Sequence, residues 1–274
     1  MRLGEFTIDW LEGGVFDLDG GTMFGVVPRV LWERKLPPIE DNYLRFRNSP
    51  MLVRTPGSNI IIETGLGNKL TEKQKRIYRV SREWDLPGGL SALGLGRADI
   101  DLVILTHCDF DHAGGVVMRG ESGAPELTFP SARHIVQRAE WDDAMNPDMR
   151  TSSTYLEENL APLRDSGLLE LVDGEREVLP GVSVMFTGGH TRGHQVVSLS
   201  SGGETAWHLG DLLPTHAHTN PLWVMAYDNY PMDAIQRKKE YLHRSSGAWL
   251  LLYHDIRYRA VRLDESGGVA EGLE

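Results

Sequence analysis

The sequence predicts an α/β layered sandwich with sheets inside and helices outside. Short apolar runs typical of buried strands form two blocks, one before about residue 136 and one after residue 178. Helical patterns join or end each block, and this order favours stacked layers of sheet and helix. No internal repeat and no low-complexity linker interrupts the chain. We therefore expect one continuous domain over residues 1–274.

The elements follow from the apolar pattern. In chain order, the expected strands are 51–53, 60–62, 102–105, 182–186, 196–199, 206–209 and 249–253. The expected helices, which carry charges on one face, are 69–84, 138–145, 154–165 and 232–244. Pro231 stands where a first helical turn tolerates proline. The stretches 19–48 and 212–230 have weak periodicity, so we expect long active-site loops there.

Composition limits the partners. The formal net charge of −11 argues against nucleic acid, which is bound largely through Lys and Arg. Residues 1–10 mix charged and apolar side chains, and no apolar run approaches the ~20 residues that span a bilayer. We therefore expect no membrane partner and a cytoplasmic location. The single cysteine, Cys108, excludes an intrachain disulfide, so stability must come from packing or bound metal.

The strongest local signal follows the apolar run 102–105. His107, Asp109, Asp111 and His112 stand within one short loop after that expected strand. Imidazole suits zinc and similar ions, and carboxylate suits harder ones, so these side chains can serve two metals. The alternative interpretation is a polar turn whose histidines make ordinary hydrogen bonds.

Three further expected strands also end in a histidine or an aspartate. His190 stands in a glycine-rich turn, Asp211 follows the run 206–209, and His254 follows the run 249–253. Repetition of this arrangement on separate strands indicates one shared edge where the side chains converge.

These motifs resemble the metallo-β-lactamase superfamily, whose loop reads His-x-His-x-Asp-His and is followed by a Gly-His turn, a Gly-Asp strand end and a late histidine. The segments 210–215, 223–228 and 253–255 are similar to the branch that contains N-acyl-homoserine lactonases and methyl parathion hydrolase. The resemblance covers nearly the whole chain. It implies a four-layer αββα sandwich with metal ions at the edge of the sheets.

The resemblance also implies a ligand set for two divalent ions. By matching motifs, His107, Asp109 and His190 would hold the first ion, Asp111, His112 and His254 would hold the second, and Asp211 would bridge both.

This chain departs from the common pattern at several positions. Asp109 replaces the second histidine of the loop, and this harder ligand favours iron, manganese or cobalt more than imidazole does, although we expect zinc first. Glu63 replaces the usual aspartate and is expected to alter the hydrogen bonds behind the ligands. Arg192 stands where many members have proline. Pro214 stands where many lactonases place a tyrosine, so the substrate is left open.

The expected function is hydrolysis of a small molecule. A metal-bound hydroxide would cleave an ester-like bond in a lactone, an ester or a phosphotriester. We expect Asp211 to bridge the ions and Asp111 to carry a proton to the leaving group. A di-iron oxidoreductase, motivated by Asp109, is the second hypothesis, and a non-catalytic metal-binding module is the third. Relatives often form homodimers, but the sequence itself leaves the oligomeric state open.

Substrate-binding residues are expected on the long loops. Phe24, Phe110 and Trp223 are aromatic side chains that suit an apolar pocket, or that pack the loops onto the domain. His216 and His218 would either orient a substrate or lie exposed on the surface.

Overall fold

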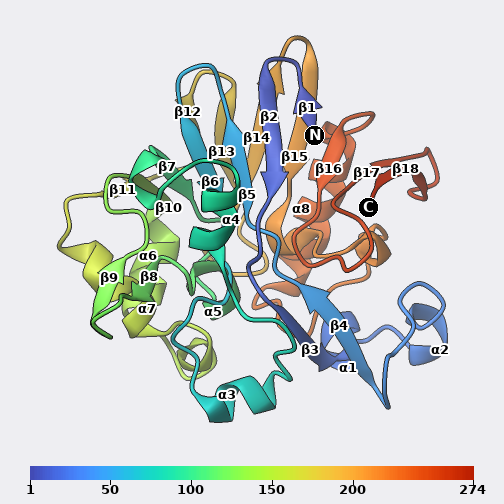
Figure 1. The fold of residues 1–274 in the computed structure, drawn as a ribbon. Coiled ribbons are helices and arrows are strands. Elements are labelled where there is room, and N and C mark those ends of the chain that lie inside the picture. The colour runs from blue at the N-terminus through green and yellow to red at the C-terminus, as the bar shows by residue number, and fades with distance from the viewer.

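A computed structural model describes residues 1–274, and two sheets of seven strands form its centre (Figure 1). The order of the first sheet is β1-β2-β5-β6-β7-β10-β11, and β6, β7, β10 and β11 run parallel. Its strands are β1 Arg2–Leu3, β2 Phe6–Trp10, β5 Met51–Arg54, β6 Asn59–Ile62, β7 Leu102–Ile104, β10 Arg133–Gln137 and β11 Leu169–Val172.

The second sheet follows the chain order from β12 to β18. Its neighbours are antiparallel except for β15 and β16, which pair in parallel. Its strands are β12 Glu175–Leu179, β13 Val182–Phe186, β14 Gln195–Ser201, β15 Glu204–His208, β16 Trp249–Leu251, β17 Ala260–Leu263 and β18 Val269–Leu273.

Alternation of side chains along the strands creates the layers. On β7, Leu102 and Ile104 pack into the core between the sheets, whereas Val103 faces the opposite side. There it packs in the cluster that includes residues of α4 Leu86–Ala92, α6 Arg138–Met145 and α7 Glu157–Arg164. The outer face of the second sheet packs against α8 Pro231–Arg244. The order is thus helix, sheet, sheet, helix, and the predicted four-layer αββα sandwich is confirmed.

Smaller elements connect the layers. They are α3 Glu72–Ile77, α5 Phe110–Ala113, β8 Val117–Arg119, β9 Pro125–Leu127 and the 3₁₀ turns Arg97–Asp99, Thr151–Ser153, Gly210–Leu212 and His216–His218. No helix is both long and apolar enough to cross a bilayer.

The stretch 19–48, expected to be a long loop, is instead largely structured. The strands β3 Val15–Asp19 and β4 Tyr43–Arg47 pair antiparallel, and α1 Gly20–Phe24 and α2 Arg29–Trp32 lie between them. This unit lies below the sheets in the view of Figure 1. A hydrophobic cluster that includes Phe16, Trp32 and Phe46 holds it together and joins it to neighbouring loops through Leu66 and Met225. Tertiary packing therefore imposed structure where the periodicity was weak.

The expected helix 69–84 is wrong in length. The helix α3 begins after Thr71, whose capping box with Gln74 satisfies the first backbone donors. It ends at Ile77, and Arg79 adopts a positive φ of 47°. The chain then pairs with β3, since the backbone nitrogen of Ser81 donates to the carbonyl oxygen of Val15. The other expected helices and strands are found within three residues of their predicted bounds, and α8 begins at Pro231 as expected.

Candidate metal centre and active-site cavity

The predicted ligands meet at one edge of the sandwich. They lie just beyond the ends of β7, β13, β15 and β16, and two of them lie on the short helix α5. Their ligand atoms form three overlapping groups, and within each group the atoms lie within 4.8 Å of one another. The groups are His107 with His112 and Asp211, His107 with Asp109 and His190, and Asp111 with His112 and His254.

One part of the site gathers around Asp109. Its Oδ2 lies 3.6 Å from Nε2 of His107 and 3.4 Å from Nε2 of His190. The same nitrogen of His190 lies 3.5 Å from Oδ2 of Asp211. These atoms together offer four donors to a first ion.

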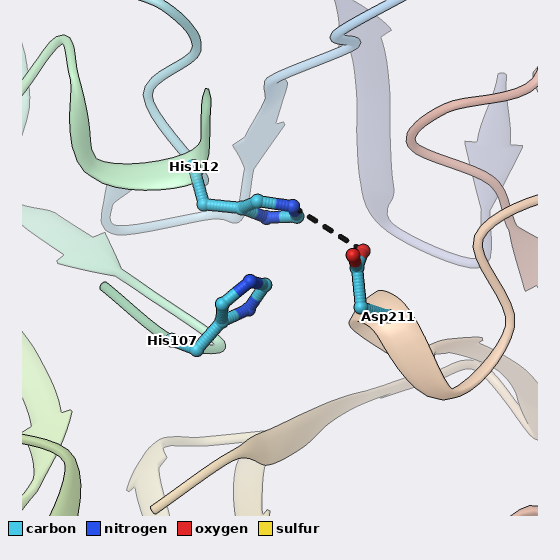
Figure 2. A group of neighbouring side chains, drawn as sticks. All are labelled: His107, His112 and Asp211. Carbon is cyan, nitrogen blue, oxygen red and sulfur yellow. Dashed lines mark ion pairs between the residues drawn. The ribbon is translucent and has the colours of Figure 1, made fainter. Parts of the chain in front are cut away.

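The other part gathers around His112 and His254. Their Nε2 atoms are 3.0 Å apart, and that of His254 lies 3.6 Å from Oδ2 of Asp111. Oδ1 of Asp211 lies 3.2 Å from Nε2 of His112, the ion pair drawn in Figure 2, and 3.4 Å from Nε2 of His254. Asp211 therefore turns one carboxylate oxygen to each part of the site.

These spacings fit a pair of metal ions. Ligands about 2.1 Å from a tetrahedral ion lie about 3.4 Å from one another, and the His–Asp separations of the site scatter around that value. Nε2 of His107, Nε2 of His190 and Oδ1 of Asp211 are buried without any hydrogen-bond partner. Buried polar atoms need partners, and divalent cations would supply them here.

Neighbouring side chains orient the imidazoles. Nδ1 of His107 lies 2.9 Å from the Thr106 hydroxyl, and Nδ1 of His190 lies 2.8 Å from Oδ1 of Asp228. With Nδ1 engaged, Nε2 of each ring faces the site. Asp228 was not among the predicted site residues, because a single acidic residue in a long loop carries no ligand pattern.

Glu63 lies behind the second part of the site. Its carboxylate accepts a hydrogen bond from the backbone of Thr106 and lies 3.3 Å from His208 and 3.4 Å from Nδ1 of His112. Burial opposes ionisation of Glu63, but the facing His112 and His208 lower its pKa to about 2. Its φ of 64° is a strained conformation for a residue other than glycine. Glu63 thus places a carboxylate against the predicted ligand His112 and against His208.

Glu140, on α6, connects the two loops that carry the first group of ligands. Its buried carboxyl accepts hydrogen bonds from the backbone nitrogen of Cys108 at 2.8 Å and from the Thr191 hydroxyl at 2.6 Å. The Tyr155 hydroxyl donates a third, at 2.8 Å. Burial raises the pKa of Glu140 to about 7, against the effect of these donors. The sequence alone does not distinguish Glu140 from an ordinary charged residue on the solvated face of a helix.

His194 braces the turn that carries His190. Its Nδ1 lies 2.7 Å from the Thr187 hydroxyl at the start of that turn. Its Nε2 accepts a hydrogen bond from the backbone nitrogen of Asp211 at 3.2 Å. The same ring therefore positions two of the loops that bear ligands.

A cavity of about 390 Å³ opens over the ligands. Asp109, Asp111, His190, Asp211 and His254 contribute to its lining. Its apolar wall is formed by Phe16, Leu18, Met23, Phe46, Phe110 and Met225, and its polar wall by Arg150, Thr151, Ser153, Thr154 and Asn229. Most of these walls were not predicted, because β3, β4 and the 150–154 turn reach the site only through the tertiary fold.

Of the predicted substrate-binding residues, Phe110 lines this cavity and four others do not. Phe24 is fully buried and stacks between Trp32, at 5.2 Å, and His218, at 4.4 Å. Trp223 meets Phe24 edge-on at 5.8 Å. These rings pack the loops together, which was the alternative interpretation of the aromatic residues.

His216 and His218 are neither exposed nor part of the lining. Nδ1 of His216 lies 2.5 Å from Oδ2 of Asp255. His218 is fully buried, with its nitrogens 2.8 Å from the Thr215 hydroxyl and 2.9 Å from the carbonyl oxygen of Met23. Both rings fix the loop after Asp211 to its surroundings.

The sequence is similar to those of a lactonase and a probable metallo-hydrolase. An N-acyl homoserine lactonase of a Bacillus species is 32% identical over 160 residues, which are 58% of this chain and 56% of that protein. The chain thus matches about half the length of this curated relative. A probable metallo-hydrolase of Mycobacterium bovis is 27% identical over 222 residues, covering 69% of this chain and 66% of the relative.

Solved structures resemble the whole fold. The structure of a probable metal-dependent hydrolase from Staphylococcus aureus superposes with a TM-score of 0.93 at 38% identity, over 100% of this chain and 98% of the other. AidC, described as a dizinc quorum-quenching lactonase and solved with a product, superposes with a TM-score of 0.78 at 21% identity, over 100% and 95% of the two chains.

The family model of the metallo-β-lactamase superfamily matches residues 45–253, which include the predicted ligands from His107 to Asp211 and end one residue before His254. The match covers most of the chain, and the αββα layers and the convergent His and Asp side chains agree with it. This chain belongs to the metallo-β-lactamase superfamily.

Proposed function

We propose that this protein is a dinuclear metal-dependent hydrolase that cleaves an ester-like bond in a small molecule. The observation that carries the proposal is the carboxylate of Asp211, with Oδ1 near His112 and His254 and Oδ2 near His190. Two divalent ions held in this way would supply hydroxide at neutral pH and polarise the bond under attack.

The chain's own residues would handle the proton and the substrate. Asp111 lines the cavity, and burial raises its pKa against the influence of His112 and His254. Its carboxylate lies beside the other predicted ligands, with Oδ2 3.6 Å from Nε2 of His254, so Asp111 is the proposed carrier of the proton to the leaving oxygen. Its backbone oxygen accepts hydrogen bonds from Asn48 and Tyr253, which fix its position.

Zinc is the metal that we propose first. Four imidazoles converge on the site, and imidazole suits zinc. A neighbour of similar fold is described as a dizinc lactonase. Asp109 adds a harder ligand, so iron, manganese and cobalt are the alternatives. The substrate classes that fit this chemistry are lactones, carboxylic esters and phosphotriesters.

Elemental analysis combined with a substrate panel tests the proposal. We expect about two divalent ions per chain, turnover of at least one lactone or aryl ester, loss of turnover on chelation and its return when metal is restored. Asp211→Asn should lower both the metal content and kcat/KM. Iron in the site with no turnover of any ester would instead support an oxidoreductase, and metal without any turnover would support a binding module.

Two further proposals accompany this one. They are a homodimer, which analytical ultracentrifugation tests, and a cytoplasmic location, which cell fractionation tests.

A further inference from the structure

The cavity above the metal ligands has two chemically different walls. Aromatic and thioether side chains from β3, β4, α1 and α5 form one wall, on which Phe16, Phe46 and Phe110 are examples. The polar wall is formed by side chains of the 150–154 turn and by Asn229. A ligand that fills the space must therefore offer both an apolar part and a polar part.

Arg150 is the single cationic side chain in this lining apart from the histidines. Its Nε donates to Oδ1 of Asn229 at 2.5 Å, and one terminal nitrogen, NH2, donates to the carbonyl oxygen of Ala226 at 2.7 Å. The backbone nitrogen of Asn229 in turn donates to the carbonyl oxygen of His190 at 2.8 Å. The guanidinium is thus fastened to the same segment that holds a metal ligand.

No carboxylate forms a salt bridge with the guanidinium of Arg150, whose side-chain acceptors are the amide oxygen of Asn229 and the carbonyl oxygen of Ala226. The nearby carboxylate of Asp148 accepts a hydrogen bond from the backbone nitrogen of Arg150 instead, at 2.8 Å. The second terminal nitrogen, NH1, has no protein acceptor. By contrast, the exposed Arg192 is paired with Asp143, and Arg138 with Asp173. A free donor on a fixed guanidinium at a cavity wall is suited to an oxyanion of a ligand.

We propose that Arg150 selects substrates that carry a carboxylate remote from the bond that is cleaved. This inference rests on the proposed hydrolase function and names the substrate class for the same cavity. The apolar wall would accommodate the chain or ring between the two groups. A single guanidinium matches one unit of negative charge, which favours a carboxylate over a dianionic phosphate. Hydroxyls of Thr151 and Ser153 on the same wall offer further donors.

Two inert ligands of matched length test the inference by calorimetry on the metal-loaded protein. They are N-phenylhexanamide, which is neutral, and the monoanilide of adipic acid, which has the same acyl length and ends in a carboxylate. We expect the acid to bind about tenfold more tightly than the neutral amide, since a charge-assisted hydrogen bond is worth about that factor. Because Arg150 is exposed, the preference should weaken as salt is raised.

Arg150→Met keeps the apolar stem of the side chain and removes its charge. It should abolish the preference while leaving the affinity for the neutral amide within about twofold. Arg150→Lys should retain part of the preference because the charge is kept. Arg164→Met, on α7 and outside the cavity lining, is the matched control and should bind both ligands as the unaltered protein does. The metal content of every variant is measured alongside.

Equal binding of the two ligands, or a preference that survives Arg150→Met, overturns the inference. Turnover of 4-nitrophenyl hexanoate and of mono-4-nitrophenyl adipate separates it from the proposed function. If both esters are hydrolysed equally well, the proposed hydrolase function is supported and the proposed role of Arg150 in substrate selection is contradicted. If neither ester nor any lactone is hydrolysed while the acid still binds preferentially through Arg150, the proposed hydrolase function is contradicted and the carboxylate-binding role of Arg150 is supported.

Discussion

Nδ1 of His190 lies 2.8 Å from Oδ1 of Asp228, and this contact decides which nitrogen of the ring faces the cavity. The other oxygen of Asp228 accepts a hydrogen bond from the backbone nitrogen of Met225 at 2.9 Å. Asp228 therefore connects a predicted metal ligand to the loop that supplies part of the cavity wall. Carboxylates that support a ligating histidine in this way raise its basicity and hold its orientation.

Replacement of Asp228 should weaken metal binding without unfolding the protein. We expect Asp228→Asn to lower the affinity for the first ion about 10- to 100-fold, because the amide no longer stabilises the N–H of His190 with a negative charge. Competition with a chromophoric chelator measures the affinity, and thermal unfolding of the metal-free protein serves as the control. An unchanged affinity would show that the ring is held by its packing alone.

The turn that carries His190 depends on close approach at Gly193. A Cβ atom at this position would overlap the backbone nitrogen and Cα of Glu140, and neither atom can move without shifting α6. Gly193→Ala should therefore displace the turn and reduce occupancy of the first metal position, measured by elemental analysis. Gly57→Ala is the matched control, since a Cβ there meets nothing within 4 Å. Full metal occupancy in Gly193→Ala would contradict this account.

Phe24 packs among the loops and does not line the cavity, so we predict that it governs stability more than substrate preference. It is fully buried between Trp32 and His218, and its removal would leave a cavity among the loops. We expect Phe24→Ala to lower the free energy of unfolding by about 3–5 kcal/mol, as measured by urea denaturation. The ranking of substrates should stay the same. A changed ranking with unchanged stability would restore the interpretation drawn from the sequence.

Protonation of His134, on β10, should lower the free energy of unfolding as the pH falls. Burial lowers its pKa to about 4, against a weaker raising effect of the carbonyl of Ala132. The unfolded chain, with a histidine pKa of about 6.5, binds the proton first, so stability is full above about pH 6.5 and is lost as pH falls towards 4. The loss should reach about 3 kcal/mol, because one pKa unit corresponds to about 1.4 kcal/mol.

The matched variant for this effect is His134→Asn, which can still donate to the Ala132 carbonyl but does not titrate. Urea unfolding of the metal-free proteins between about pH 7 and pH 4 gives the comparison. The variant should lose less stability over this range than the unaltered protein. Parallel loss in both would place the acid sensitivity in other groups.

Local pattern was sufficient for the strands of the core. The runs 102–105 and 182–186 are apolar and bounded by turn residues, so they could be recognised without knowledge of their neighbours, and β7 and β13 occupy them. The helix α3 was predicted too long, because the pairing of Ser81 with Val15 on β3 competes with the helix. A hydrogen bond between segments so far apart leaves no trace in the local periodicity.

The sequence by itself determined the family, the layered fold and the set of convergent His and Asp side chains, because each predicted ligand lies within a few residues of the end of a strand or stands on the short helix beside it. Only the tertiary structure decided what surrounds them. In the folded structure, Phe24 and His218 are buried among the loops, and Glu140 and Asp228 lie behind the predicted ligands. Arg150 lies in the lining of the cavity. The physical reason is that ligand chemistry depends on residue type and strand order, whereas exposure and contact depend on segments that meet only when the chain folds.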